Sequence, residues 1–149
     1  MGNSIPKILI VDDNEAERFL LKRILLKLGV FDEDISEAQD GEEGLKSIRT
    51  DMPQLVLLDI NMPKLNGLEV LKMVREEYGD TPPPFIVMLT TSQHESDLGN
   101  AITGGADAFS VKPNEPSKMT DIIKAVKILF VQKDNLPSEL APVFQFLKE

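Results

Sequence analysis

Short apolar runs recur along the chain, each bounded by polar residues or proline. The runs at Ile8–Val11, Leu55–Leu58 and 85–89 contain only apolar residues, and a weaker run lies at Ala108–Val111. Uninterrupted apolar runs of this length indicate strands that are buried on both faces of a sheet. Residues Ile35–Ala38 are half polar, which is typical of a strand at the edge of a sheet. We therefore expect a strand at each of these positions.

Between the expected strands, apolar residues recur at helical spacing, with polar residues on the other faces. Strands that alternate with helices in this way favour a parallel sheet covered by helices on both faces. The apolar helix positions are Leu20, Ile24 and Leu28; Leu68, Leu71 and Val74; Leu98, Ala101 and Ile102; and Met119, Ile122, Ile123, Val126 and Phe130.

The expected helix starts carry a local signal of their own. Asn14, Asp40, Asn66 and Ser92 are equally spaced along the chain, and each is followed three residues later by a glutamate. Such a side chain can accept a hydrogen bond from a free backbone N–H at a helix start, and the glutamate can reach back to it. Only the pair that begins at Ser92 matches the strict capping-box pattern. The four positions therefore predict four helix N-termini, separated each time by the length of one strand, one turn and one helix.

Composition narrows the functional classes. The chain has 149 residues and a net charge of −9, with 16 basic and 25 acidic residues and no cysteine. A cysteine-free chain has no disulfides and no cysteine-based zinc site. No cluster of lysine and arginine is visible, which argues against direct binding of nucleic acid. No apolar run approaches the roughly 20 residues of a membrane span, and residues 1–6 lack the pattern of a signal peptide. We therefore expect a soluble, cytoplasmic protein without membrane insertion.

Polar residues stand at the ends of the expected strands. Asp12 and Asp13 follow the first apolar run, Asp59 follows the third strand, Thr90 the fourth and Lys112 the fifth. Parallel α/β sheets bind ligands outside the carboxyl ends of their strands. Clustered carboxylates repel one another, and a hard cation such as Mg²⁺ relieves that repulsion. Carboxylates, a hard cation, a lysine and a hydroxyl group are together the parts needed for phosphoryl transfer. The alternatives are that the aspartates lie in solvated loops and that Thr90 is an ordinary β-branched strand residue.

The ordered set of these motifs resembles the receiver domain of two-component response regulators. The resemblance covers about residues 5–133 and implies a doubly wound, flavodoxin-like α/β fold with a five-stranded parallel sheet in the order 2-1-3-4-5. It also implies a receiver domain over residues 1–133, followed by an extension over residues 134–149. The motifs that carry it are residues 8–14, 57–63, 66–67, 89–91 and 111–113.

The resemblance implies a role for each residue of the acidic cluster. Asp59 would accept a phosphoryl group from a histidine kinase or a phosphotransfer protein. Asp13 and Asp59 would bind Mg²⁺ directly, and Asp12 would act through a water molecule. Asn61 would offer its backbone carbonyl to the metal. Beyond self-phosphorylation and loss of the phosphoryl group, the protein would not be an enzyme.

Three further residues complete the implied site. Thr90 would donate a hydrogen bond to the phosphoryl group, and Lys112 would pair with one of its oxygens. Phe109 occupies the position of an aromatic switch, which would turn inward when Asp59 is phosphorylated and so change the face made by the fourth and fifth helices. The alternative for Phe109 is an ordinary core residue.

The sequence predicts no output domain after the receiver domain, so the signal of such a stand-alone protein would pass to a downstream protein by direct contact. Residues 128–131 are consecutive apolar residues in the last expected helix, and one helix face cannot bury all of them. A homodimer through this helix and a cover formed by the tail are two candidates. Leu140, Val143, Phe144 and Leu147 have the spacing of a short amphipathic helix, and a frayed terminus is the alternative.

Two other functions fit parts of the pattern. One is a binding module that has the fold but never accepts a phosphoryl group, against which the complete set of pocket residues argues. The other is a magnesium phosphohydrolase acting on small molecules, which would place a second aspartate two residues after the first. That position holds Asn61, so the receiver function is favoured.

Overall fold

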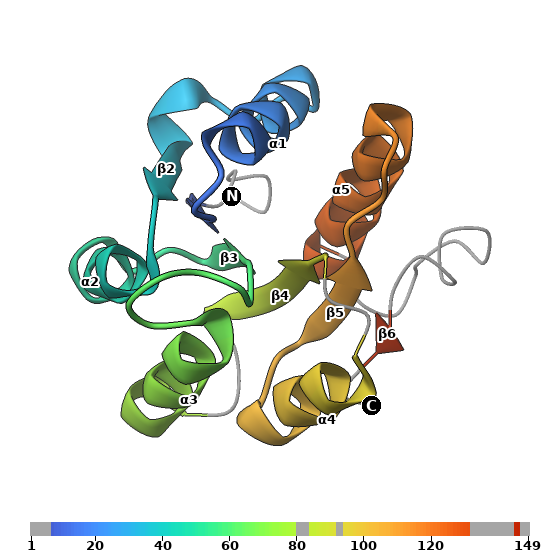
Figure 1. The fold of residues 1–149 in the computed structure, drawn as a ribbon. Coiled ribbons are helices and arrows are strands. Elements are labelled where there is room, and N and C mark those ends of the chain that lie inside the picture. Colours follow the sequence, from blue (N-terminus) through green and yellow to red (C-terminus); the bar gives the residue numbers. More distant parts are fainter. Residues whose placement is uncertain (1–6, 80–83, 92–93, 132–144, 147–149) are drawn as a thin grey trace.

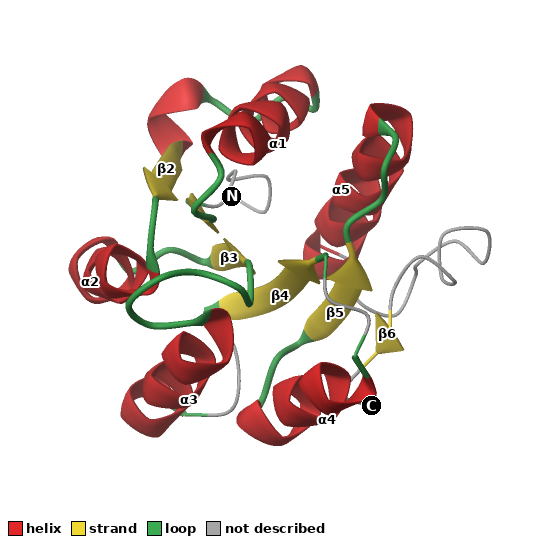
Figure 2. Cartoon of the chain, in the orientation of Figure 1, coloured by secondary structure: helices red, strands yellow, loops and turns green. Residues whose placement is uncertain are grey.

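The computed structural model describes residues 7–79, 84–91, 94–131 and 145–146, in which strands and helices alternate along the chain (Figures 1 and 2). Every apolar run that predicts a strand forms one. The strands are β1 (Ile8–Val11), β2 (Ile35–Ala38), β3 (Leu55–Leu58), β4 (Phe85–Thr90), β5 (Ala108–Val111) and β6 (Gln145–Phe146). The helices are α1 (Glu15–Lys27), α2 (Gly41–Asp51), α3 (Gly67–Tyr78), α4 (Glu95–Gly104) and α5 (Pro116–Val131), with a 3-10 turn at Asp32–Asp34.

The strands form one sheet in the order β2-β1-β3-β4-β5-β6. The first five are parallel to their neighbours, which confirms the predicted doubly wound sheet with the order 2-1-3-4-5. The half-polar strand β2 lies at one edge, as its pattern indicates. Because parallel strands end at the same side, the carboxyl ends of β1, β3, β4 and β5 share one edge of the sheet.

Alternate residues of each central strand enter two separate cores. Ile8 and Ile10 face the core shared with α1 and α5, whereas Leu9 and Val11 face the core shared with α2, α3 and α4. Figure 1 shows the same division, with α1 and α5 on one side of the sheet and the other three helices opposite. This alternation follows from the two-residue period of a strand, and it explains why the central strands are apolar at every position.

Three of the four predicted helix caps are formed. Asn14 and Asp40 accept hydrogen bonds from the backbone N–H groups three residues on. Asn66 forms a full capping box, because Glu69 also bonds back to its N–H at 3.0 Å. The prediction for the fourth helix was wrong: α4 begins at Glu95, with His94 at the N-cap position and no side-chain cap. The chain runs further beyond Thr90 before its first helical turn than the equal spacing of the caps implies, and Ser92 lies outside the described residues.

The end of the chain adds an element that the apolar pattern did not predict. β6 pairs antiparallel with β5 at the sheet edge, with Phe109 opposite Gln145. The predicted amphipathic tail helix lies otherwise outside the described residues, and Gln145–Phe146 are extended rather than helical. The side chains of residues 128–131 also lie outside the described part, so the expected homodimer contact stays a prediction. Within the described ranges, no helix combines the length and apolar character needed to cross a bilayer.

Candidate functional site

The carboxyl ends of β1 and β3 bring two aspartates together. The strands are paired with Val11 opposite Leu58, so Asp12 and Asp59 emerge at the same edge. The N–H of Asp59 donates to the carbonyl of Val11 at 3.0 Å. The N–H of Asp12 donates to the carbonyl of Ala38 at 3.1 Å. Backbone pairing therefore continues one residue beyond each strand and fixes both aspartates at their α-carbons.

Asp12, Asp13 and Asp59 form a cluster of carboxylates. One oxygen from each lies within 4.8 Å of the others. Asp12 and Asp59 are buried, at 2% and 7% exposure, while Asp13 is exposed. The three aspartates therefore come together as the strand ends predict, and the cluster is buried at Asp12 and Asp59 and open to solvent at Asp13.

Lys112 reaches this cluster from the end of β5. Its Nζ lies 2.5 Å from Oδ2 of Asp12 and 3.6 Å from Oδ2 of Asp59. Burial acts to lower the pKa of this ammonium group, but the hydrogen bond to Asp12 and the charges of Asp59 and Glu17 outweigh burial and raise the pKa. Lys112 therefore stays protonated and supplies a fixed positive charge.

The surroundings of Asp59 oppose its ionisation. Burial, helped by the negative charges of Asp12 and Asp13, raises the pKa of Asp59 to about 6. The charge of Lys112 and the N–H of Ile60, which donates to Oδ1 at 2.8 Å, act in the other direction. A buried carboxylate with two carboxylate neighbours is stabilised by a further cation. Hard oxygen donors with one solvent-facing side fit Mg²⁺, which keeps several waters, so the residues present match the predicted metal.

Two further predicted residues, Thr90 and Phe109, lie on β4 and β5. Thr90 is fully buried at the end of β4, and its carbonyl accepts the N–H of Lys112 at 2.7 Å. Phe109 is also buried, at 3% exposure, and pairs with Met88 across the two strands. The ring of Phe109 therefore packs inward, in the core, in this structure.

The loop between β3 and α3 closes tightly behind Asp59. The N–H of Gly67 donates to the carbonyl of Ile60 at 2.8 Å. A Cβ atom on Gly67 would lie 2.0 Å from the carbonyl oxygen of Asp59, so only glycine fits there. Asn61 is exposed in this loop, and the predicted role of its carbonyl stays a prediction.

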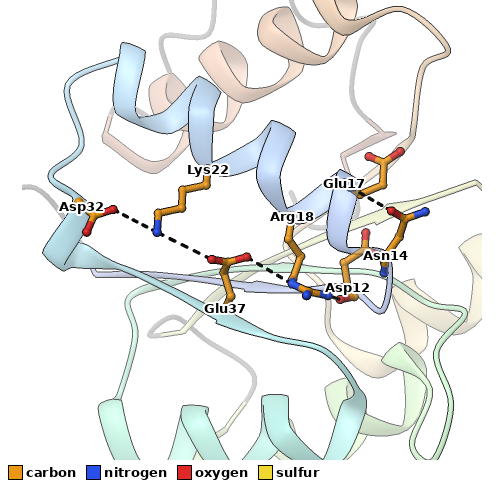
Figure 3. A network of polar contacts seen from close by, with 7 residues as sticks. All are labelled: Asp12, Asn14, Glu17, Arg18, Lys22, Asp32 and Glu37. Carbon is orange, nitrogen blue, oxygen red and sulfur yellow. Dashed lines mark hydrogen bonds and ion pairs between the residues drawn. The ribbon is translucent and has the colours of Figure 1, made fainter.

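Two residues of α1 belong to the neighbourhood of the site and were not predicted from the sequence (Figure 3). Nη1 of Arg18 donates to the carbonyl oxygen of Asp12 at 2.7 Å. Oε2 of Glu17 is buried, with no hydrogen-bond partner among the described residues, and the charge of Glu17 helps to raise the pKa of Lys112. Helical side chains tilt toward the helix N-terminus. From this tilt, one could have predicted that both side chains point back toward the end of β1.

Comparison with known proteins agrees with this geometry. The family model described as "Response regulator receiver domain" matches residues 8–124. The chain is 39% identical over 120 residues to the alkaline phosphatase synthesis transcriptional regulatory protein PhoP of Bacillus subtilis, covering 80% of the chain and 48% of that protein. It is 33% identical over 123 residues to a chemotaxis protein CheY homolog of Campylobacter jejuni, covering 80% of the chain and 91% of that protein.

A solved structure has a similar fold. The crystal structure of the phosphorylated cyanobacterial phytochrome response regulator RcpA matches with a TM-score of 0.76 and 26% identity, covering 91% of this chain and all of that one. The chain spans about half the length of PhoP, and 63% of the length of the nitrate/nitrite response regulator protein NarL of Escherichia coli. The similarity to these two regulators therefore covers only part of each of them.

Proposed function

The chain belongs to the response regulator receiver domain family, and from this premise we propose that it accepts a phosphoryl group on Asp59. Receiver domains are signalling modules of two-component systems and generally not enzymes, and they bind Mg²⁺ in an acidic pocket. Our proposals concern the acceptor, its partners and the switch. They rest on the geometry at the carboxyl edge of the sheet.

One observation carries the proposal. The buried carboxylate of Asp59 lies within 4.8 Å of the carboxylates of Asp12 and Asp13. It is also 3.6 Å from the ammonium group of Lys112, and these groups come from three different strand ends. A site built for structure alone would gain little from three carboxylates within 4.8 Å, because like charges at such distances repel. The arrangement is suited to a carboxylate that is used as a nucleophile beside cations.

The transfer step follows from these positions. An oxygen of the Asp59 carboxylate attacks the phosphorus of a phosphohistidine on the donor protein. The new oxygen–phosphorus bond forms as the phosphorus–nitrogen bond breaks, and the imidazole nitrogen leaves with the electron pair and takes a proton from water. Lys112 is already 3.6 Å from Asp59 Oδ2 and pairs with an oxygen of the transferred group. Bound Mg²⁺ supplies further positive charge to those oxygens. Asp13 and Asp59 would hold it directly, Asp12 through water, and Asn61 through its carbonyl.

The signal would leave the site through β4 and β5. Thr90 and Lys112 are joined by a backbone hydrogen bond of 2.7 Å, so a shift of Thr90 toward a phosphoryl oxygen also acts on the end of β5. Phe109 lies on the same strand, three residues earlier. Since its ring is buried here, the switch requires a second, more exposed orientation in the other state. Only an unequal stabilisation of the two states by the phosphoryl group can drive the change.

The partners follow from this role. A histidine kinase or phosphotransfer protein would supply the phosphoryl group, and a downstream protein would bind the face of α4, β5 and α5. The match to a chemotaxis CheY homolog over 91% of that protein supports signalling by protein contact, while PhoP is a transcriptional regulatory protein. A homodimer through α5 remains a candidate route for the output.

Incubation with acetyl phosphate and Mg²⁺, followed by intact mass measurement, tests the acceptor. We expect the wild-type protein to gain the mass of one phosphoryl group and Asp59→Asn to gain none. Asp51→Asn, at the exposed end of α2, removes one carboxylate outside the cluster and should be phosphorylated like the wild type. A gain of mass by Asp59→Asn would show that the acceptor assignment is wrong.

The same samples separate the alternatives. Repeated turnover of small phosphoesters would favour a phosphohydrolase, and the absence of any phosphorylation with acetyl phosphate or a donor kinase would favour a binding module. Amide chemical shifts test the switch separately. Phosphorylation should move the resonances of α4, β5 and α5, and unchanged shifts there would remove the switch while leaving the acceptor in place.

A further inference from the structure

The backbone carbonyl of Asp12 is held by a side chain from α1. Nη1 of Arg18 donates to this oxygen at 2.7 Å, and Nε of the same guanidinium group donates to Oε1 of Glu37 at 3.3 Å. Figure 3 shows Arg18 lying between Asp12 at the end of β1 and Glu37 on β2. The shorter of the two bonds goes to the carbonyl, so the main contact of Arg18 is with the turn that carries the acidic pair.

Each polar group of Asp12 has a hydrogen-bond partner. Its N–H bonds to Ala38, as in the regular ladder of the sheet. Its Oδ1 accepts the N–H of Asn14 at 2.9 Å, and its Oδ2 accepts Lys112. The carbonyl is the polar group that projects beyond the sheet, where no strand can pair with it, and Arg18 occupies that place.

The carbonyl of Asp12 controls where Asp13 points. The peptide unit is planar, so the carbonyl of Asp12 and the N–H of Asp13 rotate together. A bond that holds the carbonyl therefore also sets the direction in which Asp13 leaves the strand. Asp13 is exposed, and its side chain makes no hydrogen bond or ion pair within the described ranges. Its orientation thus depends on the backbone that precedes it.

Arg18 is itself held in place by a chain of charges. Its side chain is only 13% exposed, and Glu37, which it contacts, also lies 3.8 Å from Nζ of Lys22. Lys22 in turn pairs with Asp32 at 3.1 Å. Exposed ion pairs contribute little by themselves, but a planar guanidinium group can serve a carbonyl and a carboxylate at once. Lysine has no such fixed fork, so arginine is specifically suited to this bridge.

We propose that Arg18 is a positioning residue of the magnesium and phosphoryl site, which fixes Asp13 through the peptide group that follows Asp12. Glu37 keeps the guanidinium group of Arg18 in line with that carbonyl. The inference rests on the proposed function of the pocket, because Asp13 matters only if it binds the metal. Residues that orient metal ligands typically change metal affinity when they are replaced.

The sign of the effect distinguishes positioning from simple charge. Arg18 brings a positive charge close to an acidic pocket, so removing that charge alone would make the pocket more negative and tighten Mg²⁺ binding. Removing a group that orients Asp13 would weaken binding instead. A merely structural role would lower the free energy of unfolding without changing the affinity of the folded protein.

Titration with MgCl₂, followed by NMR, tests the proposal on the full chain. We expect Arg18→Gln to bind Mg²⁺ roughly 10-fold more weakly than the wild type. Arg18→Lys, which keeps a donor for the carbonyl, should recover part of the loss, and Glu37→Gln should show a smaller loss than Arg18→Gln. Arg49→Gln breaks an ion pair with Glu77 between α2 and α3, away from the pocket, and should bind like the wild type. Equal or tighter binding by Arg18→Gln would overturn the proposal.

A readout without metal separates this inference from the proposed function. Amide hydrogen exchange at Asp13 should be faster in metal-free Arg18→Gln than in the wild type, and unchanged exchange counts against the positioning role. A wild-type protein that binds no Mg²⁺ would instead remove the metal site itself. If Arg18→Gln does not fold, Glu37→Gln provides the same two measurements, and wild-type values for both would overturn the proposal.

Discussion

Lys112 and Asp12 meet at the carboxyl edge of the sheet, with Nζ of Lys112 2.5 Å from Oδ2 of Asp12, although they are 100 positions apart in the chain. The same ammonium group is 3.6 Å from Asp59. Lys112 therefore neutralises part of the charge that a metal ion would also neutralise. Because the proposed Mg²⁺ site uses the carboxylates that Lys112 contacts, the lysine should weaken the binding of the metal.

Replacement of Lys112 by glutamine should tighten Mg²⁺ binding several-fold while slowing phosphoryl transfer. The pocket loses its internal cation, which raises its attraction for a divalent ion. At the same time, no ammonium group remains to pair with the transferred oxygens. Isothermal titration with MgCl₂ measures the first effect, and the rate of mass gain with acetyl phosphate measures the second.

Lys118→Gln is the matched control for this prediction. Lys118 is exposed on α5 and pairs with Glu115 at 4.0 Å, so its replacement makes the same change of charge outside the cluster. We expect no change in affinity or rate. Unaltered Mg²⁺ affinity in Lys112→Gln would show that the lysine does not compete with the metal.

The pocket could be predicted from the sequence because its residues stand where apolar runs end. Asp12, Asp59 and Thr90 each follow an uninterrupted apolar run, and a parallel sheet places such residues together whatever the details of packing. Lys112 follows the weaker run and belongs to the same edge. Their convergence depends on topology, which the pattern of strands and helices determines.

Other features depend on tertiary contacts that no local pattern encodes. Arg18 lies on the polar side of an amphipathic helix, and only the packing of α1 against β1 and β2 shows that it reaches the carbonyl of Asp12. The start of α4 depends on the path of the loop after Thr90. Pairing of β6 with β5 involves two residues, too few for a hydrophobic period to be visible. The contacts of long side chains and the paths of loops therefore could not be predicted from the sequence.

The cap of α2 predicts a pH-dependent contribution to stability. Oδ1 of Asp40 accepts the N–H of Glu43 at 2.8 Å, and Nζ of Lys64 lies 3.5 Å from Oδ2. The hydrogen bond from Glu43, with help from the charge of Lys64 and against burial, holds the pKa of Asp40 below its ordinary value of 3.8. A lowered pKa in the folded state stabilises the protein above 3.8, and this stabilisation is lost as pH falls through the folded-state pKa.

Asp40→Ala should therefore lower the free energy of unfolding by about 1 kcal/mol at neutral pH. Asp40→Asn keeps the capping oxygen and should lose less. Urea unfolding of both variants and the wild type, from neutral pH to well below 3.8, measures the difference. The advantage of the wild type over Asp40→Asn should shrink at acid pH, and a constant difference would contradict the assigned role of the charge.

Two glycines should respond oppositely to the same substitution. A Cβ on Gly67 would meet the carbonyl oxygen of Asp59 at 2.0 Å, whereas one on Gly99 would have no atom within 4 Å. Gly67→Ala should lower the free energy of unfolding by about 1–3 kcal/mol and slow phosphorylation, because the backbone of Asp59 must shift. Gly99→Ala, within α4, should raise stability by about 1 kcal/mol.

Urea unfolding and the mass assay measure both effects of these substitutions. Gly99→Ala serves as the control for the added methyl group and should be phosphorylated like the wild type. A Gly67→Ala variant with the stability and phosphorylation rate of the wild type would show that the loop after β3 can move away from Asp59 at little cost.

Arg75 forms a buried polar contact that joins α3 to the sheet. Its guanidinium group donates to Oδ2 of Asp107 at 2.8 Å and to the carbonyls of Gly105 and Pro84 at 2.9 and 3.0 Å. The side chains of Arg75 and Asp107 are 3% and 2% exposed. Removal of one partner from a buried pair leaves the other charge without compensation.

Arg75→Met should therefore lower the free energy of unfolding by about 3–5 kcal/mol. The double variant Arg75→Met/Asp107→Asn should lose less than Arg75→Met alone, because no buried carboxylate is then left without its arginine. The asparagine oxygen can still accept the N–H of Ile86, which bonds to Asp107 at 2.8 Å. Urea unfolding of both single variants and the double variant completes the cycle. A double variant that loses as much as the two single losses combined would show that the two residues stabilise the fold independently.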